Sequence, residues 1–233
     1  SLHDALPILT QTNSGSMYLM SASIDAGVSA LQDDDDKNVF KNKDRIKIIN
    51  LGPIVNYSGV DYAPTVSADG KILYFVSDRP GSKILPNGKA SHDFWATKKE
   101  NRLDTFFIVP VSIDTTTKYG DRGVNTRFNE GTASIAADKQ SLYFTACHRA
   151  DGFGDCDIYR TSVEGDQWGQ PVNLGPNVNS KFWEAQPSIA PDQSRLYFVS
   201  NRPGPNSKGN ANSDQMDIWY CDYDDDTEEW LPA

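Results

Sequence analysis

Three groups of charged residues recur along the chain, and each group could form ion pairs or bind a cation. Each group contains an acidic residue, an arginine and an aspartate, in that order. The acidic residues are Asp61, Glu130 and Glu184, the arginines are Arg79, Arg149 and Arg202, and the aspartates are Asp93, Asp157 and Asp217. Because a guanidinium can form two parallel hydrogen bonds with a carboxylate, the pattern predicts one arginine between two carboxylates in each group.

Two interpretations of these groups stand side by side. In the first, each arginine and its carboxylates form a structural clamp that fixes the ends of neighbouring strands. In the second, Asp61, Glu130 and Glu184 ring the mouth of a central channel, where they would attract a cation or a basic peptide. The threefold occurrence favours the clamp, since a binding site rarely needs the same three residues three times.

The chain contains three cysteines, and their placement predicts a disulfide. Cys147 ends one expected strand and Cys156 opens the antiparallel neighbour, so the hairpin between them can bring the two sulfurs together. Disulfides persist in oxidising compartments such as the periplasm. The alternatives are two reduced, packed thiols, or a metal site built from Cys147, His148 and Cys156 that lacks an evident fourth ligand. We expect the disulfide, no metal and no cofactor, with Cys221 as a buried thiol.

Sequence motifs of common enzymes are missing. The chain has no G-x-S-x-G nucleophile elbow, no phosphate-binding loop and no H-E-x-x-H motif, which favours a protein that is not an enzyme. The formal net charge of −10 opposes binding to nucleic acid, because phosphate contacts need clustered lysines and arginines. No apolar run approaches 18 residues, so no transmembrane segment is predicted.

The charged groups belong to an internal repeat. The segments Asn50–Asp69 and Asn173–Asp192 align without a gap and lie 123 residues apart. A third copy, which begins at Val124 and ends at Asp138, lies 54 residues before the last one. Such repetition is the first feature to test in a sequence, because it decides the architecture.

Each copy continues in the same order, through elements that are typical of strands. An apolar run with Tyr-Phe comes first, then a turn that contains the arginine, then a loop, and then an Asp-x-aromatic step; the apolar runs are residues 72–76, 142–145 and 196–199. Short β-branched and aromatic runs between turn residues predict strands. Four antiparallel strands per unit predict an all-β fold of β-propeller blades. A β-sandwich is disfavoured, because sandwich strands do not repeat a motif in register.

The repeated motif resembles a known family. The segment from Pro64 through Asp78-Arg79-Pro80-Gly81, with its later Asp-x-Trp step, looks like the WD-like repeat of TolB-type propellers, and the resemblance covers about residues 50–230. The variant from Phe144 to Tyr159 is similar to blades of envelope proteins that carry an OmpA-type, peptidoglycan-binding domain. The resemblance implies a protein of the bacterial cell envelope, in the periplasm or associated with the outer membrane.

The repeat also divides the chain. Residues 1–8 look like a non-native leader, so the native N-terminus and any signal peptide would be missing. We expect a partial N-terminal blade over 9–51 and blades over 52–123, 124–178 and 179–233, the last truncated at the following linker. This division gives about three full blades plus a partial one. Closed propellers usually have four to eight blades, so a fragment of a larger ring is predicted.

Three functions fit this pattern. The first is a non-catalytic binding or scaffolding module of the envelope, which docks a protein or peptide partner. The alternative is the substrate-gating propeller domain of a serine peptidase whose catalytic domain is missing from this chain. A carbohydrate-active propeller, such as a polysaccharide lyase, would need several histidines in its channel, and these are not evident.

Overall fold

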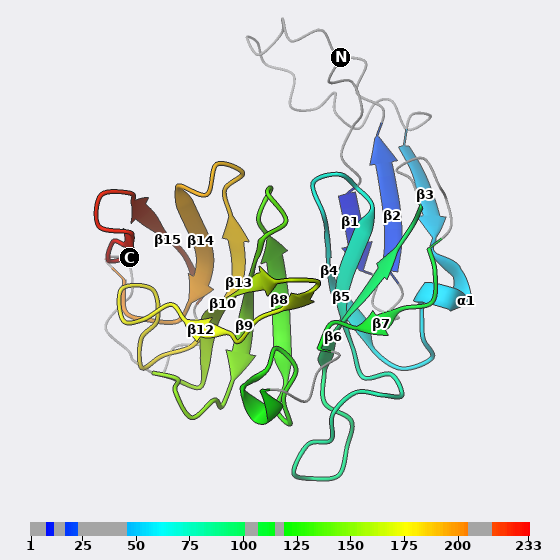
Figure 1. The fold of residues 1–233 in the computed structure, drawn as a ribbon, viewed down its shortest axis with the longest axis horizontal. Coiled ribbons are helices and arrows are strands. Elements are labelled where there is room, and N and C mark those ends of the chain that lie inside the picture. The colour runs from blue at the N-terminus through cyan, green and yellow to red at the C-terminus, as the bar shows by residue number, and fades with distance from the viewer. Residues whose placement is uncertain (1–7, 12–16, 23–45, 101–106, 115–118, 205–215) are drawn as a thin grey trace, which may run out of the picture.

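The structure is a computed structural model, and it describes residues 8–11, 17–22, 46–100, 107–114, 119–204 and 216–233. These residues form four antiparallel sheets that stand side by side (Figure 1). The N-terminal sheet has three strands, β1 (Ile8–Gln11), β2 (Met17–Ala22) and β3 (Ile46–Asn50). Of the predicted leader, only Ile8 lies in the described residues, and it opens β1.

The other three sheets have four or five strands each. The first blade contains β4 (Asp61–Val66), β5 (Ile72–Ser77), β6 (Asp93–Lys98) and β7 (Val111–Ser112). The second contains β8 (Glu130–Ile135), β9 (Ser141–Cys147), β10 (Cys156–Glu164), β11 (Gln167–Trp168) and β12 (Val172–Asn173). The third contains β13 (Glu184–Ile189), β14 (Arg195–Ser200), β15 (Asp217–Asp224) and β16 (Glu229–Trp230). Among the described residues, the connections contain the short helix α1 (Gly52–Val55) and the 3-10 turn Gly120–Arg122.

The first strands of the blades are neighbours in space. Strand β4 lies against β8, and β8 lies against β13, while β1 and β2 of the N-terminal sheet lie against β4. Within each blade the strand order follows the chain from this innermost strand outward. Sheets that are stacked in this way around their first strands are propeller blades, so the predicted all-β fold is confirmed.

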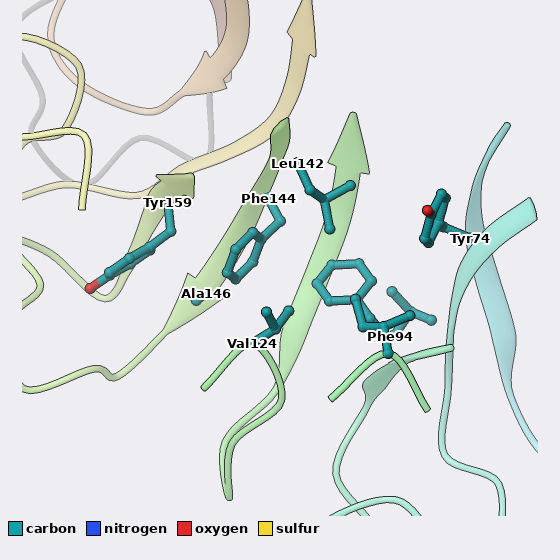
Figure 2. Packing of buried hydrophobic residues seen from close by; sticks show 9 residues of the cluster. Tyr74, Phe94, Val124, Leu142, Phe144, Ala146 and Tyr159 are labelled. Carbon is teal, nitrogen blue, oxygen red and sulfur yellow. The ribbon is translucent and has the colours of Figure 1, made fainter. Parts of the chain in front are cut away.

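Aromatic side chains fill the space between blades. Between the first and second blades, Phe94 packs edge-on against Phe144 with ring centroids 5.5 Å apart, and Leu142 and Tyr159 belong to the same cluster (Figure 2). A second cluster joins the second and third blades and includes Ile158. A strand that packs on both faces must be apolar on both faces, which explains the unbroken apolar runs in the sequence.

The two long repeat copies occupy equivalent places in their sheets. Asn50 of β3 pairs with Tyr18 of β2, and Asn173 of β12 pairs with Tyr159 of β10. In both copies the asparagine side chain accepts a hydrogen bond of 2.8 Å from the backbone N–H of the glycine two residues later. Strand β3 is therefore an outermost strand like β12, and the described N-terminal sheet corresponds to the second to fourth strands of a blade.

Candidate functional site

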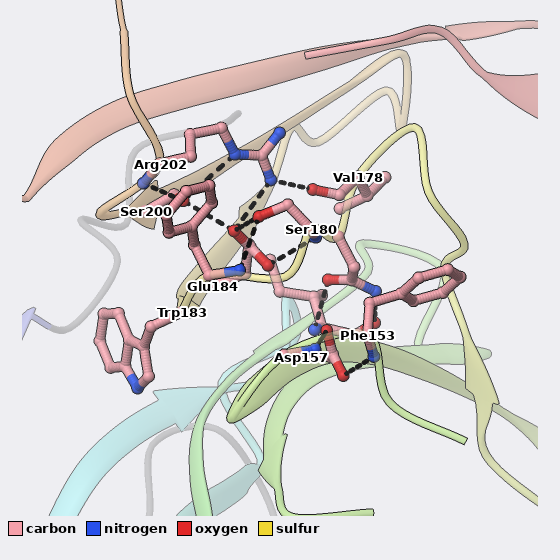
Figure 3. A network of polar contacts seen from close by, with 12 residues as sticks. Phe153, Asp157, Val178, Ser180, Trp183, Glu184, Ser200 and Arg202 are labelled. Carbon is pink, nitrogen blue, oxygen red and sulfur yellow. Dashed lines mark hydrogen bonds and ion pairs between the residues drawn. The ribbon is translucent and has the colours of Figure 1, made fainter. Parts of the chain in front are cut away.

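The charged group of the third blade forms one buried network at the end of its second strand (Figure 3). Arg202 Nη2 lies 3.1 Å from Glu184 Oε1, and Arg202 Nε donates to Ser200 Oγ at 3.2 Å. The same Nη2 donates to the backbone carbonyl of Val178, in the linker that enters the blade. One guanidinium thus ties together the linker, the innermost strand and the second strand.

The carboxylate of Glu184 is fully buried, and its hydrogen-bonding capacity is well used. Its Oε1 accepts bonds from the hydroxyls of Ser180 and Ser200, each at 2.7 Å, and its Oε2 accepts a bond of 2.8 Å from the backbone N–H of Ser180. A buried charge is tolerated only when it is paired and hydrogen bonded, and Glu184 meets both conditions.

The first blade repeats this geometry. Arg79 Nη2 donates to Asp61 Oδ1 at 2.8 Å and to the carbonyl of Val55 at 2.6 Å, while Nε donates to Ser77 Oγ at 3.0 Å. The backbone N–H of Tyr57 donates to the other carboxylate oxygen of Asp61 at 2.6 Å. Each partner holds the same repeat position as its counterpart in the third blade.

The second blade departs from the pattern, because Ala146, which pairs with Glu130, stands where the other blades have a serine. Arg149 still donates to the carbonyl of Val124 at 2.9 Å, but its Nη2 lies 3.7 Å from Glu130 Oε1. Its buried Nε has no hydrogen-bond partner. Burial raises the pKa of Glu130 and lowers the pKa of Arg149, so this ion pair is the least well compensated of the three.

Cys147, the residue after Ala146, is bonded to Cys156, and the predicted disulfide is confirmed. The two residues face each other across β9 and β10. The backbone of Cys156 also forms an isolated β-bridge with that of Trp183, just before the third blade. Cys221 is a free, buried thiol, and burial raises its pKa to about 11. The disulfide hairpin therefore lies at the junction of the second and third blades.

All three guanidinium groups also lie over aromatic rings. Each arginine contacts a ring from the second strand and a ring from the third strand of its blade, with distances to the ring centroids between 4.7 and 5.6 Å. The pairs of rings are Phe75 and Trp95, Phe144 and Tyr159, and Phe198 and Trp219. Cation–π contacts of this kind strengthen when water is excluded, so they add to each buried network.

The aspartates at the start of the third strands accept hydrogen bonds from the loops before them. Asp93 accepts bonds from the backbone N–H of Lys83, at 2.8 Å, and from the hydroxyl of Ser91. Asp157 accepts bonds from the backbone N–H groups of Phe153, at 2.8 Å, and Gly154, at 3.3 Å. These carboxylates fix the preceding loops, and burial raises the pKa of Asp157 to about 6.

Asp217 opens β15 and is exposed; the loop before it, residues 205–215, lies outside the described residues. The structure thus pairs each arginine with the acidic residue of the innermost strand. In the first and second blades, the aspartate of the third strand accepts hydrogen bonds from backbone N–H groups of the preceding loop.

Two asparagines that the sequence analysis did not single out complete the networks. Asn125 accepts a bond from the N–H of Phe94 at 2.7 Å and donates to its C=O at 2.9 Å. Asn179 does the same with Ile158, at 2.8 and 2.9 Å. Each side-chain amide thus forms the pair of hydrogen bonds that a neighbouring strand would form with the third strand. The repeated Val-Asn dipeptide was the signal for these positions.

The acidic residues predicted at a channel mouth, Asp61, Glu130 and Glu184, are all buried beside their arginines. Their charge is therefore compensated locally, by a guanidinium in each blade. Among the described residues, no group of three or more histidine, cysteine, aspartate or glutamate side chains is placed to hold a metal ion. Within the same residues, no helix is long and apolar enough to cross a membrane.

The same end of the blades carries exposed apolar side chains. Tyr57 and Val60 precede β4, Ile84 lies in the loop between β5 and β6, and Phe153 lies in the disulfide hairpin. The first strands start at this end and the second strands finish there, so these residues share one face, which we call the loop face.

The loop face also carries two cations at one repeat position. Arg127 lies over the ring of Phe128, with its Cζ 5.6 Å from the centroid, and Lys181 lies over Phe182, with its Nζ 5.4 Å away. Both pairs directly precede the first strand of a blade, so the loop face combines apolar and cationic groups.

The fold and these networks define a set of β-propeller blades. Neither a protein-family model nor a curated protein matches the sequence. Among solved structures, an α-L-arabinofuranosidase from Lactobacillus brevis is similar with a TM-score of 0.50 and 13% identity, over 96% of this chain and 74% of that one. At this identity the likeness concerns the fold alone.

Two peptidases are also similar, at lower scores. A puromycin-hydrolyzing peptidase of Mycobacterium tuberculosis matches with a TM-score of 0.43 and 14% identity, over 88% of this chain and 28% of that one. The tricorn protease matches with a TM-score of 0.39 and 12% identity, over 84% and 14%. This chain thus spans less than a third of the length of either peptidase.

Proposed function

We propose that the chain is a non-catalytic binding module of the bacterial cell envelope, whose loop face docks a protein or peptide partner. The observation that carries this proposal is the exposure of Tyr57, Val60, Ile84 and Phe153 on loops whose backbone N–H groups bond to buried carboxylates. Aromatic side chains on a rigid frame supply contact area at a low cost in conformational entropy.

The way the loops are fixed supports a binding role. The N–H of Tyr57 is held by the carboxylate of Asp61, and the N–H of Phe153 is held by that of Asp157. The disulfide closes the hairpin that presents Phe153. An apolar residue that is already ordered before binding loses little freedom when a partner covers it.

The disulfide supports an oxidising location, and the resemblance to TolB-type repeats supports the periplasm or the outer membrane. The partner is expected to be a polypeptide with apolar side chains and no strong negative charge, because the chain carries a formal charge of −10. Asp61, Glu130 and Glu184 are buried in ion pairs with arginines, which supports a role without catalysis.

A peptide library displayed on phage tests the proposal. Peptides enriched on the full chain should lose at least about tenfold in affinity when Tyr57 and Phe153 are both changed to serine. The control is Val172→Ser, which alters an exposed apolar residue of the outer strand β12. Peptides that bind the double variant as tightly as the original chain would contradict the proposal, as would the absence of any enriched peptide.

A further inference from the structure

One face of the third blade exposes side chains whose counterparts in the other blades are buried. Ile218 of β15 is 81% exposed, whereas Phe94 and Ile158, at the same repeat position, are fully buried. In the first two blades this face is covered by the blade that follows. Phe94 packs on Phe144 of the second blade, and Ile158 belongs to the cluster shared with the third.

The second strands show the same contrast. Tyr74 of the first blade and Tyr143 of the second are buried, and each meets the tryptophan of the next blade's outer strand. Trp168 lies edge-on to Tyr74 and Trp230 lies edge-on to Tyr143, both with ring centroids 6.2 Å apart. Tyr197 is the third member of the tyrosine series, and it is 41% exposed.

Polar bonds between blades follow the same series. Lys139 Nζ donates to Asp69 Oδ2 at 3.0 Å, and Gln193 Nε2 donates to Asp138 Oδ2 at 3.0 Å. In both cases the turn of one blade bonds to the aspartate in the turn of the preceding blade. Asp192 holds the equivalent place in the third blade.

The backbone follows the same path at the end of the third blade as at the end of the second blade. The N–H of Gly169, just after β11, donates to the carbonyl of Ser162 at 2.8 Å. The N–H of Leu231, just after β16, donates to the carbonyl of Asp222 at 2.8 Å. After Gly169 the chain continues into the linker whose Asn179 covers the edge of Ile158.

We propose that the face of β14 and β15 is the seat of a further blade of the same repeat, supplied by the same polypeptide. That blade would bring an asparagine amide to the backbone of Ile218, a tryptophan ring to Tyr197 and a polar donor from its first turn to Asp192. The repeated course of the chain after β16 favours this occupant over a second copy of the protein.

An extended variant tests the proposal directly. Residues 172–233 are added a second time after Ala233. This continues the repeat in register, because three residues separate Trp168 from Val172 and three residues follow Trp230. The amide hydrogen exchange of Ile218 is then measured in both chains. In the extended chain it should slow by at least about 100-fold, since an opening of the new interface would be needed first.

The matched control is the same extension with Asn179→Ala in the added copy only. It should leave the exchange of Ile218 fast while the near-ultraviolet circular dichroism of the added tryptophans persists. Unchanged exchange of Ile218 in the extended chain overturns the proposal, and so does an added copy that stays unfolded. Protection of Ile218 in the unextended chain that disappears on dilution would assign the face to a second copy and would overturn it as well.

Discussion

The guanidinium of Arg202 lies 3.1 Å from the carboxylate of Glu184, and the Glu184 side chain has no contact with solvent. The same relationship links Arg79 to Asp61 at 2.8 Å, with a buried carboxylate again. Removal of one partner from such a pair leaves an uncompensated buried charge, which costs more than the pair itself contributes. The networks are therefore best tested by deleting arginines one at a time.

Replacement of Arg202 by alanine should lower the free energy of unfolding by about 3 kcal/mol. The control is Arg195→Ala, because Arg195 forms an ion pair of 2.6 Å with Asp222 at the surface, where both side chains are exposed. That change should move the denaturation midpoint far less than Arg202→Ala does, because exposed ion pairs contribute little to stability. Urea denaturation of both variants checks the prediction, and equal midpoints for the two would contradict the clamp.

Replacement of Asn179 by alanine should destabilise the junction of the second and third blades. The N–H and C=O of Ile158 would lose their side-chain partners in a buried place, at a cost of about 2 kcal/mol. Asn179→Asp keeps the acceptor but turns a buried carboxylate oxygen toward the C=O of Ile158, so it should be at least as destabilising as alanine. Denaturation midpoints of the three proteins measure this order, and an alanine variant as stable as the original chain would refute the role.

The second blade offers a test of the serine that it lacks. The substitution Ala146→Ser would supply the hydroxyl that Ser77 and Ser200 give to their arginines, and it would leave the disulfide in place. The variant should be more stable than the original chain by about 1 kcal/mol, because the buried Nε of Arg149 would gain a partner. Urea denaturation of the two proteins measures the difference. A variant no more stable than the original chain would show that Nε gains nothing from the serine.

Thiol counting tests the arrangement of the cysteines. The folded chain should react with no alkylating reagent at pH 8, because Cys221 is buried and burial raises its pKa to about 11. The unfolded, unreduced chain should take up one label, and the reduced chain three. Mass spectrometry gives these counts directly. Three labels without a reductant would eliminate the Cys147–Cys156 bond in the protein.

A pH dependence follows from Asp157. Burial raises its folded-state pKa from 3.8 to about 6, so the folded protein holds this proton more tightly than the unfolded chain does. The contribution of Asp157 to stability is therefore fully present below about pH 4 and is lost as the pH rises through 6. Asp157→Asn keeps an acceptor for the N–H of Phe153 without the charge.

Thermal unfolding of the original chain and of Asp157→Asn between pH 4 and pH 7 checks this dependence. The difference in melting temperature between the two proteins should shift in favour of the variant as the pH rises. A difference that stays constant over the range would show that Asp157 does not titrate there.

Much of the fold could be predicted because the repeat fixes it several times over. The aligned copies at Asn50 and Asn173 gave the strand order and the face on which the arginines lie, and the structure places the copies equivalently. The disulfide could be predicted as well, because Cys147 and Cys156 flank one hairpin turn.

Other features depend on packing that a single sequence does not display. In the first strands of the first and third blades, a bulge places Ala63 and Gln186 in left-handed backbone angles, and no glycine in the sequence indicates it. The bonding partners of Asp93 and Asp157 were also predicted wrongly, as arginines. In the structure these carboxylates accept hydrogen bonds from backbone N–H groups of the preceding loops, which lie nearer. Competition of this kind is decided by distances, and pattern alone does not give them.

The central claim is that each blade repeats the same contacts and that the third blade keeps one face open. Amide hydrogen exchange of Phe94, Ile158 and Ile218 in the unmodified chain tests it most directly. We predict slow exchange for Phe94 and Ile158, whose N–H groups are held by Asn125 and Asn179, and fast exchange for Ile218. Fast exchange at Ile158, or protection of Ile218 equal to that of Phe94 at every protein concentration, would contradict the account.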